Sequence, residues 1–373
     1  MQHDNPLRVL IVEDTVIYRK IVSDVLAELP HVEVVGTAHN GKTAIIKIAS
    51  LKPDLLTLDI EMPEMNGLEV LAHIKTAAPH VGAIVLSTLT HKSGELTMKA
   101  LELGAFDFIP KPQEGSISEN TAAIKSTIAP MIKAFARHKE IKGILRQVKI
   151  LASAAESDAK RPPDSAKIVQ RMSTITGRKR GNSEVVAIGI STGGPNALAQ
   201  MMPKLPAKLG APILIVQHMP PVFTRSLAVS LNAKCYLEVR EAVDGEPLRP
   251  DTALIAPGGK QMKVVAAADG KSRIIRITDD PPENSCKPSV DYLMRSIAHH
   301  YKDRATGVIM TGMGSDGMLG LKLMKRNGAT ILAQDESTCV VYGMPKEPIE
   351  AGIVDVIAPL DKLAEEIVRA VGR

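Results

Sequence analysis

The sequence predicts an α/β protein of two domains, because two series of alternating strand-like and helix-like segments are separated by a basic stretch. The chain has 373 residues, which is long for a single hydrophobic core. Short apolar runs, typical of strands buried on both faces of a parallel sheet, alternate with segments of helical periodicity over residues 7–112 and again from residue 184. We therefore expect one domain at 1–125, a helical and basic linker at 126–183, and a second domain at 184–373.

The first domain is expected to be a doubly wound, five-stranded parallel sheet with right-handed crossovers, since strands and helices alternate regularly through it. A further helix is expected to follow at 120–149. The expected strands lie at 8–12, 32–35, 54–59, 83–87 and 106–109, and the expected helices between them lie at 16–29, 42–51, 67–76 and 95–103.

The second domain is expected to contain a mostly parallel sheet with an antiparallel hairpin. Asp269-Gly270 stands between two strand-like runs, which is a signal for a tight hairpin turn. The sheet strands are expected at 185–190, 213–217, 306–310 and 330–333, and the hairpin strands at 261–266 and 271–278.

The composition is that of a soluble globular protein, with 45% apolar and 23% charged residues. Aromatic residues make up only 2% and tryptophan is absent, which argues against a stacking platform for single-stranded nucleic acid. Cys235, Cys286 and Cys339 are far apart and form no CxxC pair, so they indicate neither a zinc knot nor a disulfide framework. The N-terminus is unlike a signal peptide, and no apolar run approaches the roughly 20 residues of a membrane span. We expect a cytoplasmic protein with reduced thiols and no membrane insertion.

Charged side chains gather at the predicted strand ends of the first domain. Glu13 and Asp14 follow the first strand, Asp59 ends the third, Ser87 ends the fourth and Lys111 follows the fifth. The carboxyl edge of a doubly wound sheet is where ligands bind. Three carboxylates at one edge repel each other, and a bound divalent cation such as Mg²⁺ would offset this repulsion. Lys111 would then pair with an incoming phosphoryl group, and Ser87 would donate a hydrogen bond to it.

Over essentially all of residues 7–112, this pattern resembles the receiver domain of bacterial response regulators. The acidic pair is Glu-Asp, where that family more often has Asp-Asp. The resemblance implies that Asp59 is phosphorylated by a histidine kinase with Mg²⁺ as cofactor. It also implies that Glu13, Asp14 and Asp59 hold the ion together with the backbone carbonyl of Glu61.

Ser191, His218 and Asp316 each follow a predicted strand of the second domain, so they are expected at the same edge of its sheet. Ser191 precedes Gly193-Gly194 and a helical run, and a helix N-terminus presents free N–H groups to a developing oxyanion. The arrangement predicts a Ser–His–Asp relay, in which His218 accepts the serine proton and Asp316 orients the imidazole. No cofactor is expected for this chemistry.

Longer motifs extend the pattern around these residues, and together with the first domain they resemble the family of chemotaxis-specific protein-glutamate methylesterases (CheB). Ile190 stands where alanine is common in that family, and Ser315 stands where asparagine is common, but neither change removes a required group. The motifs are Ser191–Pro195, Gln217–Pro220, Phe223–Arg225, Ala256–Gly259, Pro288–Asp291 and Thr311–Gly317.

This second resemblance implies a phosphorylation-activated esterase. Ser191 would be the nucleophile, Thr192 and Met313 would line the site, and the Met313 backbone would be a candidate oxyanion donor. The substrates would be glutamate γ-methyl esters of methyl-accepting chemotaxis receptors, with methanol released, and certain receptor glutamines would be deamidated. The activity would serve sensory adaptation. The first domain would cover the serine cleft until Asp59 is phosphorylated.

Three other interpretations account for parts of the sequence. A two-component hydrolase of the same architecture, acting outside flagellar chemotaxis, would carry the same motifs. A DNA-binding response regulator would use the seven basic residues of 160–182, but no helix-turn-helix pattern follows the first domain, and no specific nucleic-acid partner is expected. A phosphate- or nucleotide-binding module would use the glycine-rich turns at 193–194 and 312–317, but the P-loop motif is missing.

Overall fold

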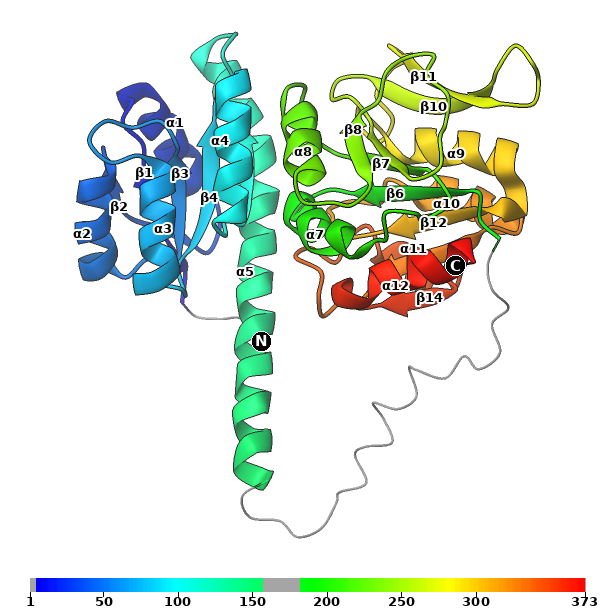
Figure 1. The fold of residues 1–373 in the computed structure, drawn as a ribbon. Helices are drawn as coiled ribbons and strands as arrows, with labels where there is room; N and C mark the ends of the chain where they lie inside the picture. The colour runs from blue at the N-terminus through cyan, green and yellow to red at the C-terminus, as the bar shows by residue number, and fades with distance from the viewer. Residues whose placement is uncertain (1–4, 157–181, 373) are drawn as a thin grey trace.

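The structure is a computed structural model that describes residues 5–156 and 182–372. It contains a five-stranded parallel sheet, a seven-stranded parallel sheet and a separate two-stranded antiparallel hairpin, which confirms the expected fold class (Figure 1). Nearly all of the basic stretch at 160–182 lies outside the described residues. Among the described helices, none combines the length and the apolar character needed to cross a membrane.

The first sheet has the strand order β2-β1-β3-β4-β5. Its strands are apolar because both faces are buried, one under helices α1 and α5 and the other under α2, α3 and α4. The elements are β1 (Leu7–Val12), α1 (Val16–Ala27), β2 (Val32–Ala38), α2 (Gly41–Leu51), β3 (Leu55–Asp59), α3 (Gly67–Ala77), β4 (Gly82–Ser87), α4 (His91–Glu102), β5 (Asp107–Pro110) and α5 (Ile117–Glu156).

Helix α5 crosses the domain boundary expected at residue 125. Its side chains Ile124, Ile128, Ile132 and Phe135 are buried in the core of the first domain. The Phe135 ring also meets the Phe106 ring edge-on, with 5.2 Å between the centroids. The first domain therefore includes α5 at least as far as Phe135.

The second domain has the strand order β14-β13-β12-β6-β7-β9-β8, with the hairpin β10–β11 as a separate sheet. Its elements are β6 (Val185–Ile190), α7 (Gly194–Met201), β7 (Ile213–Gln217), α8 (Phe223–Asn232), β8 (Glu238–Glu241), β9 (Thr252–Ile255), β10 (Gln261–Ala266), β11 (Arg273–Thr278), α9 (Val290–Tyr301), β12 (Ala305–Ile309), α10 (Met318–Arg326), β13 (Thr330–Gln334), α11 (Lys346–Glu350), β14 (Val356–Ala358) and α12 (Leu360–Val371), with short 3₁₀ helices at Met202–Lys204 and Lys302–Arg304.

Strand order reverses between β1 and β3 in the first sheet and, at the middle of the second sheet, between β6 and β12. At such a point the connections after two neighbouring strands lead to opposite sides, which leaves a crevice at the carboxyl edge of the sheet. The acidic residues of the first domain lie at its reversal point. Ser191 follows β6, and Asp316 lies in the loop after β12, so both lie at the reversal point of the second domain.

The two domains are in contact through α4 of the first and α7 and α8 of the second (Figure 1). Strand β5 also takes part, through Phe108 and Asp107. One continuous apolar cluster includes buried residues of both domains. The rings of Phe108 and Phe223 lie 4.5 Å apart, centroid to centroid. The Asn196 amide donates to the backbone carbonyl of Ala105 at 3.1 Å. This interface places β5 beside the turn that carries Ser191.

Candidate active site

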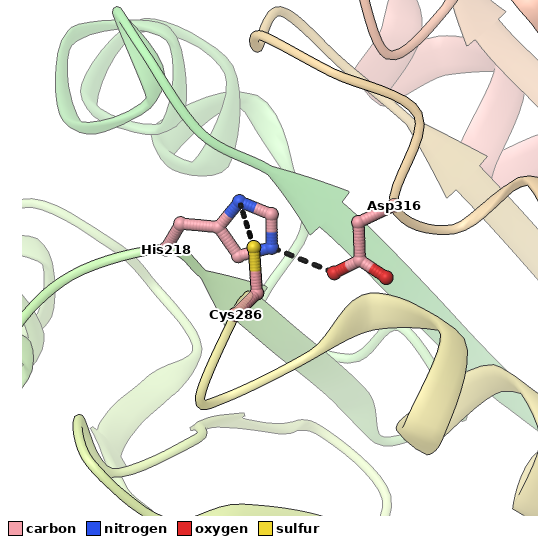
Figure 2. A group of neighbouring side chains, drawn as sticks. All are labelled: His218, Cys286 and Asp316. Carbon is pink, nitrogen blue, oxygen red and sulfur yellow. Dashed lines mark hydrogen bonds and ion pairs between the residues drawn. The ribbon is translucent and has the colours of Figure 1, made fainter. Parts of the chain in front are cut away.

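His218 and Asp316 form a hydrogen-bonded pair across the carboxyl edge of the second sheet. The His218 Nε2 lies 2.8 Å from an Asp316 carboxylate oxygen (Figure 2). Because a carboxylate only accepts, Nε2 carries the proton, and Nδ1 is the basic nitrogen. Burial alone would lower the pKa of His218, but the bonds to Asp316 and Cys286 raise it to about 9. The bond to Asp316 thus makes Nδ1 more basic and favours the imidazolium form that follows proton transfer.

The Asp316 side chain comes from the loop after β12 and lies against the N-terminal end of α9. The backbone N–H groups of Val290 and Asp291 donate to its carboxylate at 2.7 and 3.1 Å, and the Ser289 hydroxyl donates at 2.9 Å. Burial would raise the pKa of Asp316, but the bond with His218 and these N–H groups lower it to about 2. Positive partial charge at the helix end adds to the same effect. The carboxylate therefore stays ionised and fixed beside the histidine.

Ser191 lies in the sharp turn between β6 and α7, one strand away from His218. The backbone N–H of His218 donates to the Ile190 carbonyl at 3.1 Å, and the Gln217 side chain donates to the Ser191 carbonyl at 3.0 Å. Gly193 closes the turn with φ of 74°, a conformation that side chains disfavour. Within the described residues the Ser191 hydroxyl makes no hydrogen bond, so the serine lies beside the His218–Asp316 pair without being bonded to it.

Two backbone N–H groups near Ser191 are candidates for an oxyanion site. The Ser191 N–H itself is occupied, because it donates to the Thr311 carbonyl at 3.0 Å. The N–H groups of Thr192 and Met313 donate to no acceptor in the described part of the chain. Thr192 is buried and Met313 is half-buried. These are the two residues that the sequence indicated as lining the site.

A carboxylate of the first domain reaches this turn. Asp107, the first residue of β5, accepts a hydrogen bond from the Gly193 backbone N–H at 3.2 Å. Asp107 is buried, and burial raises its pKa to about 6 against the opposing effect of its hydrogen bonds. Its role was not apparent from the sequence, because a polar residue at a strand start is unremarkable without the partner domain. In the docked arrangement, one N–H at the start of α7 is thus occupied by a carboxylate.

Cys286 and Asn284 are further neighbours that sequence reasoning missed. Cys286 Sγ lies 3.8 Å from His218 Nδ1 (Figure 2), and the Asn284 amide donates to Asp316 at 3.1 Å. Both come from the loop between the hairpin and α9, which has no periodic pattern to indicate its position. The nearby motif Pro288–Asp291 was the only signal that this loop belongs to the site.

The acidic residues of the first domain form a second cluster. Ligand oxygens of Glu13, Asp14 and Asp59 all lie within 4.8 Å of one another. The Lys111 ammonium lies 2.8 Å from oxygens of both Glu13 and Asp59 and is itself buried. The sequence-based expectation that these four residues meet at one sheet edge thus matches their positions.

The electrostatics of this cluster favour an added cation. Burial and the charge of Asp59 raise the pKa of Glu13 to about 7, because Lys111 alone does not balance the carboxylates. Burial also raises the pKa of Asp59, against the attraction of Lys111. A hard divalent cation with oxygen ligands, such as Mg²⁺, fits this donor set.

The side chains of Glu61 and Ser87 lie beside the cluster without joining it, whereas the Glu61 backbone N–H donates to the Asp59 carboxylate at 3.3 Å. The Glu61 carboxylate is turned toward α4, where it accepts from the Ser93 hydroxyl at 2.9 Å. The Ser87 hydroxyl accepts from Thr97 at 2.7 Å and makes no hydrogen bond to Asp59 in the described structure. Both residues therefore connect the acidic site to α4, the helix that faces the second domain.

Comparison with known proteins finds two families along the chain. Residues 186–367 match the family described as CheB methylesterase, and residues 9–121 match the response regulator receiver domain. The protein-glutamate methylesterase/protein-glutamine glutaminase of Desulfotalea psychrophila is 54% identical over 98% of both chains. The protein of the same name from Trichodesmium erythraeum is 40% identical over 98% of this chain and 99% of its own. Among solved structures, the Thermotoga maritima CheB methylesterase catalytic domain is 41% identical, with a TM-score of 0.49, and covers 50% of this chain and 98% of that one.

Proposed function

The chain belongs to the CheB methylesterase family, and on that premise we propose that it is a phosphorylation-activated protein-glutamate methylesterase and protein-glutamine deamidase of chemoreceptors. The observation that carries the proposal is the His218–Asp316 pair, held at 2.8 Å beside Ser191 at the reversal point of the sheet. A serine, a basic imidazole nitrogen and a buried carboxylate are the groups that acyl transfer needs. Because the substrate region of such receptors lies inside the cell, we propose a cytoplasmic location.

Hydrolysis begins with attack of Ser191 Oγ on the ester carbonyl, while His218 Nδ1 accepts the serine proton. The N–H groups of Thr192 and Met313 donate to the oxyanion. The imidazolium, stabilised by Asp316, then returns the proton to the leaving alkoxide, and methanol departs. Water, deprotonated by Nδ1, attacks the acyl-enzyme and leaves a free glutamate carboxylate and the original serine. A glutamine side chain would release ammonia by the same steps.

Regulation starts at Asp59. Glu13, Asp14 and Asp59 would hold Mg²⁺, whose charge lets an anionic phosphodonor, supplied by a histidine kinase, approach the Asp59 carboxylate. A phosphoryl group there competes with Glu13 for Lys111, which directly follows β5. Since β5 also carries Asp107 and Phe108, a shift of this strand acts on the contacts to Gly193 and Phe223. Phosphorylation thereby shifts the chain from a docked to an open arrangement.

Methanol release from a methylated receptor cytoplasmic fragment tests this function. With Mg²⁺ and a small phosphodonor, release by the wild-type chain is expected to rise roughly 5- to 150-fold, the usual range of coupling between two sites. Asp59→Asn is expected to remove the rise and keep the basal rate, while Asp24→Asn, an exposed residue of α1, keeps both. A full response of Asp59→Asn would contradict the switch. Release only from methylated receptors of another sensory system would place the enzyme outside flagellar chemotaxis.

A bulky side chain placed between the two domains is expected to activate methanol release without phosphorylation. A Cβ on Gly94 of α4 would lie 2.5 Å from the Ser226 hydroxyl of α8. Leucine suits a helix better than glycine does, so α4 should stay folded in Gly94→Leu. Its side chain leaves no room for α8. Basal methanol release without phosphodonor should therefore rise toward the rate of the phosphorylated wild type. Gly143→Leu is the matched control, because nothing lies within 4 Å of that position in α5. Unchanged basal release in Gly94→Leu would mean that docking does not inhibit.

A further inference from the structure

Cys286 gives the active site a soft ligand that the proposed hydrolysis does not use. Its Sγ lies 3.8 Å from His218 Nδ1, the nitrogen that takes the serine proton in the mechanism above. The thiol, the imidazole and the Asp316 carboxylate each offer a ligand atom, and these atoms all lie within 4.8 Å of one another (Figure 2). The thiol is half-buried, so small ions reach it from solvent.

The spacing matches that of a zinc site. In tetrahedral Zn²⁺ coordination, with Zn–S of about 2.3 Å and Zn–N of about 2.0 Å, a sulfur and a nitrogen ligand lie about 3.5 Å apart. The observed 3.8 Å between Sγ and Nδ1 needs only a small adjustment. Thiolate and imidazole together favour Zn²⁺ over Mg²⁺ or Ca²⁺, which prefer oxygen ligands. Two coordination positions would be left for water.

The surroundings hold both ligands in place. Asp316 accepts from Nε2–H of His218, and a carboxylate on the far nitrogen of a metal-bound histidine fixes the ring and strengthens the ligand. Cys286 lies in a tight loop, where its backbone exchanges hydrogen bonds with Glu283 at 2.8 and 3.1 Å. Asn284, in the same loop, is tied to Asp316 at 3.1 Å. The loop thus positions the sulfur relative to the histidine.

We propose that His218 Nδ1 and Cys286 Sγ form an inhibitory site for a thiophilic divalent cation, with Zn²⁺ as the ion that best fits. Binding forms a Zn–N and a Zn–S bond, and the thiol proton is released to the buffer. The Nδ1 lone pair that would accept the Ser191 proton is then shared with the metal. The esterase step is therefore blocked while the ion is bound. The inhibitory part of this inference rests on the proposed function, whereas the binding part does not.

Inhibition is tested on the full-length chain, reduced with a non-thiol reductant and freed of metal by a chelator. Zn²⁺ is added at constant Mg²⁺, and methanol release is measured. Cys286→Ala, compared with its own metal-free rate, is expected to need at least roughly 10- to 100-fold more Zn²⁺ for half-inhibition than the wild type, because loss of a ligand costs no less than loss of an outer-shell partner. Cys235→Ala, a half-buried thiol elsewhere in the domain, should behave as the wild type. Equal inhibition of the Cys286→Ala and wild-type chains would overturn the proposal.

Binding is tested separately with Co²⁺, which substitutes for Zn²⁺ and gives a near-ultraviolet charge-transfer band when a thiolate binds it. The band is expected in the wild type and in Ser191→Ala, and it should be lost in both Cys286→Ala and His218→Ala. A wild-type chain without the band, or a band that persists in Cys286→Ala, would refute the site. Because this readout needs no substrate, failure of the proposed esterase function does not affect it.

Discussion

Ser191→Ala is expected to lower the rate of methanol release roughly 10⁶-fold in kcat, as removal of a nucleophilic serine does in other serine hydrolases. The alanine keeps the Cβ that packs against Gly312, so the fold around the turn should be unaffected. The Ser191 hydroxyl is the only group of this turn that forms a covalent bond to the substrate in the proposed mechanism, and alanine lacks it. The residual rate would come from oriented binding and the oxyanion donors alone.

The measurement is single-turnover methanol release with the phosphodonor present, so that docking does not limit the rate. Ser315→Ala is the matched control, because that serine is exposed in the loop beside Asp316 and has no part in the mechanism. Retention of more than a tenth of the wild-type rate in Ser191→Ala would assign the chemistry to another residue. The glycine-rich turns would then be reconsidered as a phosphate-binding site.

Asp316→Asn is expected to lower kcat by about 10⁴-fold, the effect of the same change in a Ser–His–Asp triad. An amide in this position presents an N–H₂ group where the carboxylate accepts from His218 Nε2, and the imidazole would turn or change tautomer. The Nδ1 lone pair would no longer be held ready for the serine proton. Michaelis constants should change far less than kcat, because Asp316 lies behind the histidine and is almost fully buried.

The same variant is expected to unfold more easily. Asp316 accepts charge-assisted bonds from Ser289, Val290 and Asp291, and each such bond contributes about 1.5–3 kcal/mol. The pKa of Asp316 is lowered to about 2, so this stabilisation is present above the unfolded-state value of about 4 and is lost as the pH falls toward 2. Urea unfolding at pH 7 and pH 3 measures both effects. Asp303→Asn, an exposed control, should change neither, and an unaltered stability of Asp316→Asn at pH 7 would contradict the argument.

The sequence predicted the residues whose position follows from strand ends. Each of Ser191, His218 and Asp316 comes after an apolar run, and parallel strands bring their carboxyl ends to one edge. Three strands of the second domain were missed: β8 and β14 at the two edges of its sheet, and the short strand β9 beside β8. An edge position does not require an apolar run. β8 is such a strand, and three of its four residues in Glu238–Glu241 are charged.

Contacts that depend on non-periodic segments were not predictable in the same way. Cys286 and Asn284 reach the site from a loop whose path is fixed by its own hydrogen bonds. The contact between Asp107 and Gly193 depends on how two domains dock, and no local pattern records that. Helix α5, expected at 120–149, extends beyond both expected ends and covers Ile117–Glu156, since helix ends depend on local capping.

Strand β5 links the two sites of the molecule, and the link must act in both directions. Asp107 at its start contacts the esterase turn, and Lys111, just after its end, contacts Asp59. If phosphorylation weakens docking by some factor, docking weakens the phosphorylated state by the same factor, because the coupling free energy is shared. Under the proposed switch, the docked chain would therefore carry a less stable phosphoryl group than the open chain. A receptor that held the second domain apart from the first would make Asp59 easier to phosphorylate, so substrate would favour its own demethylation.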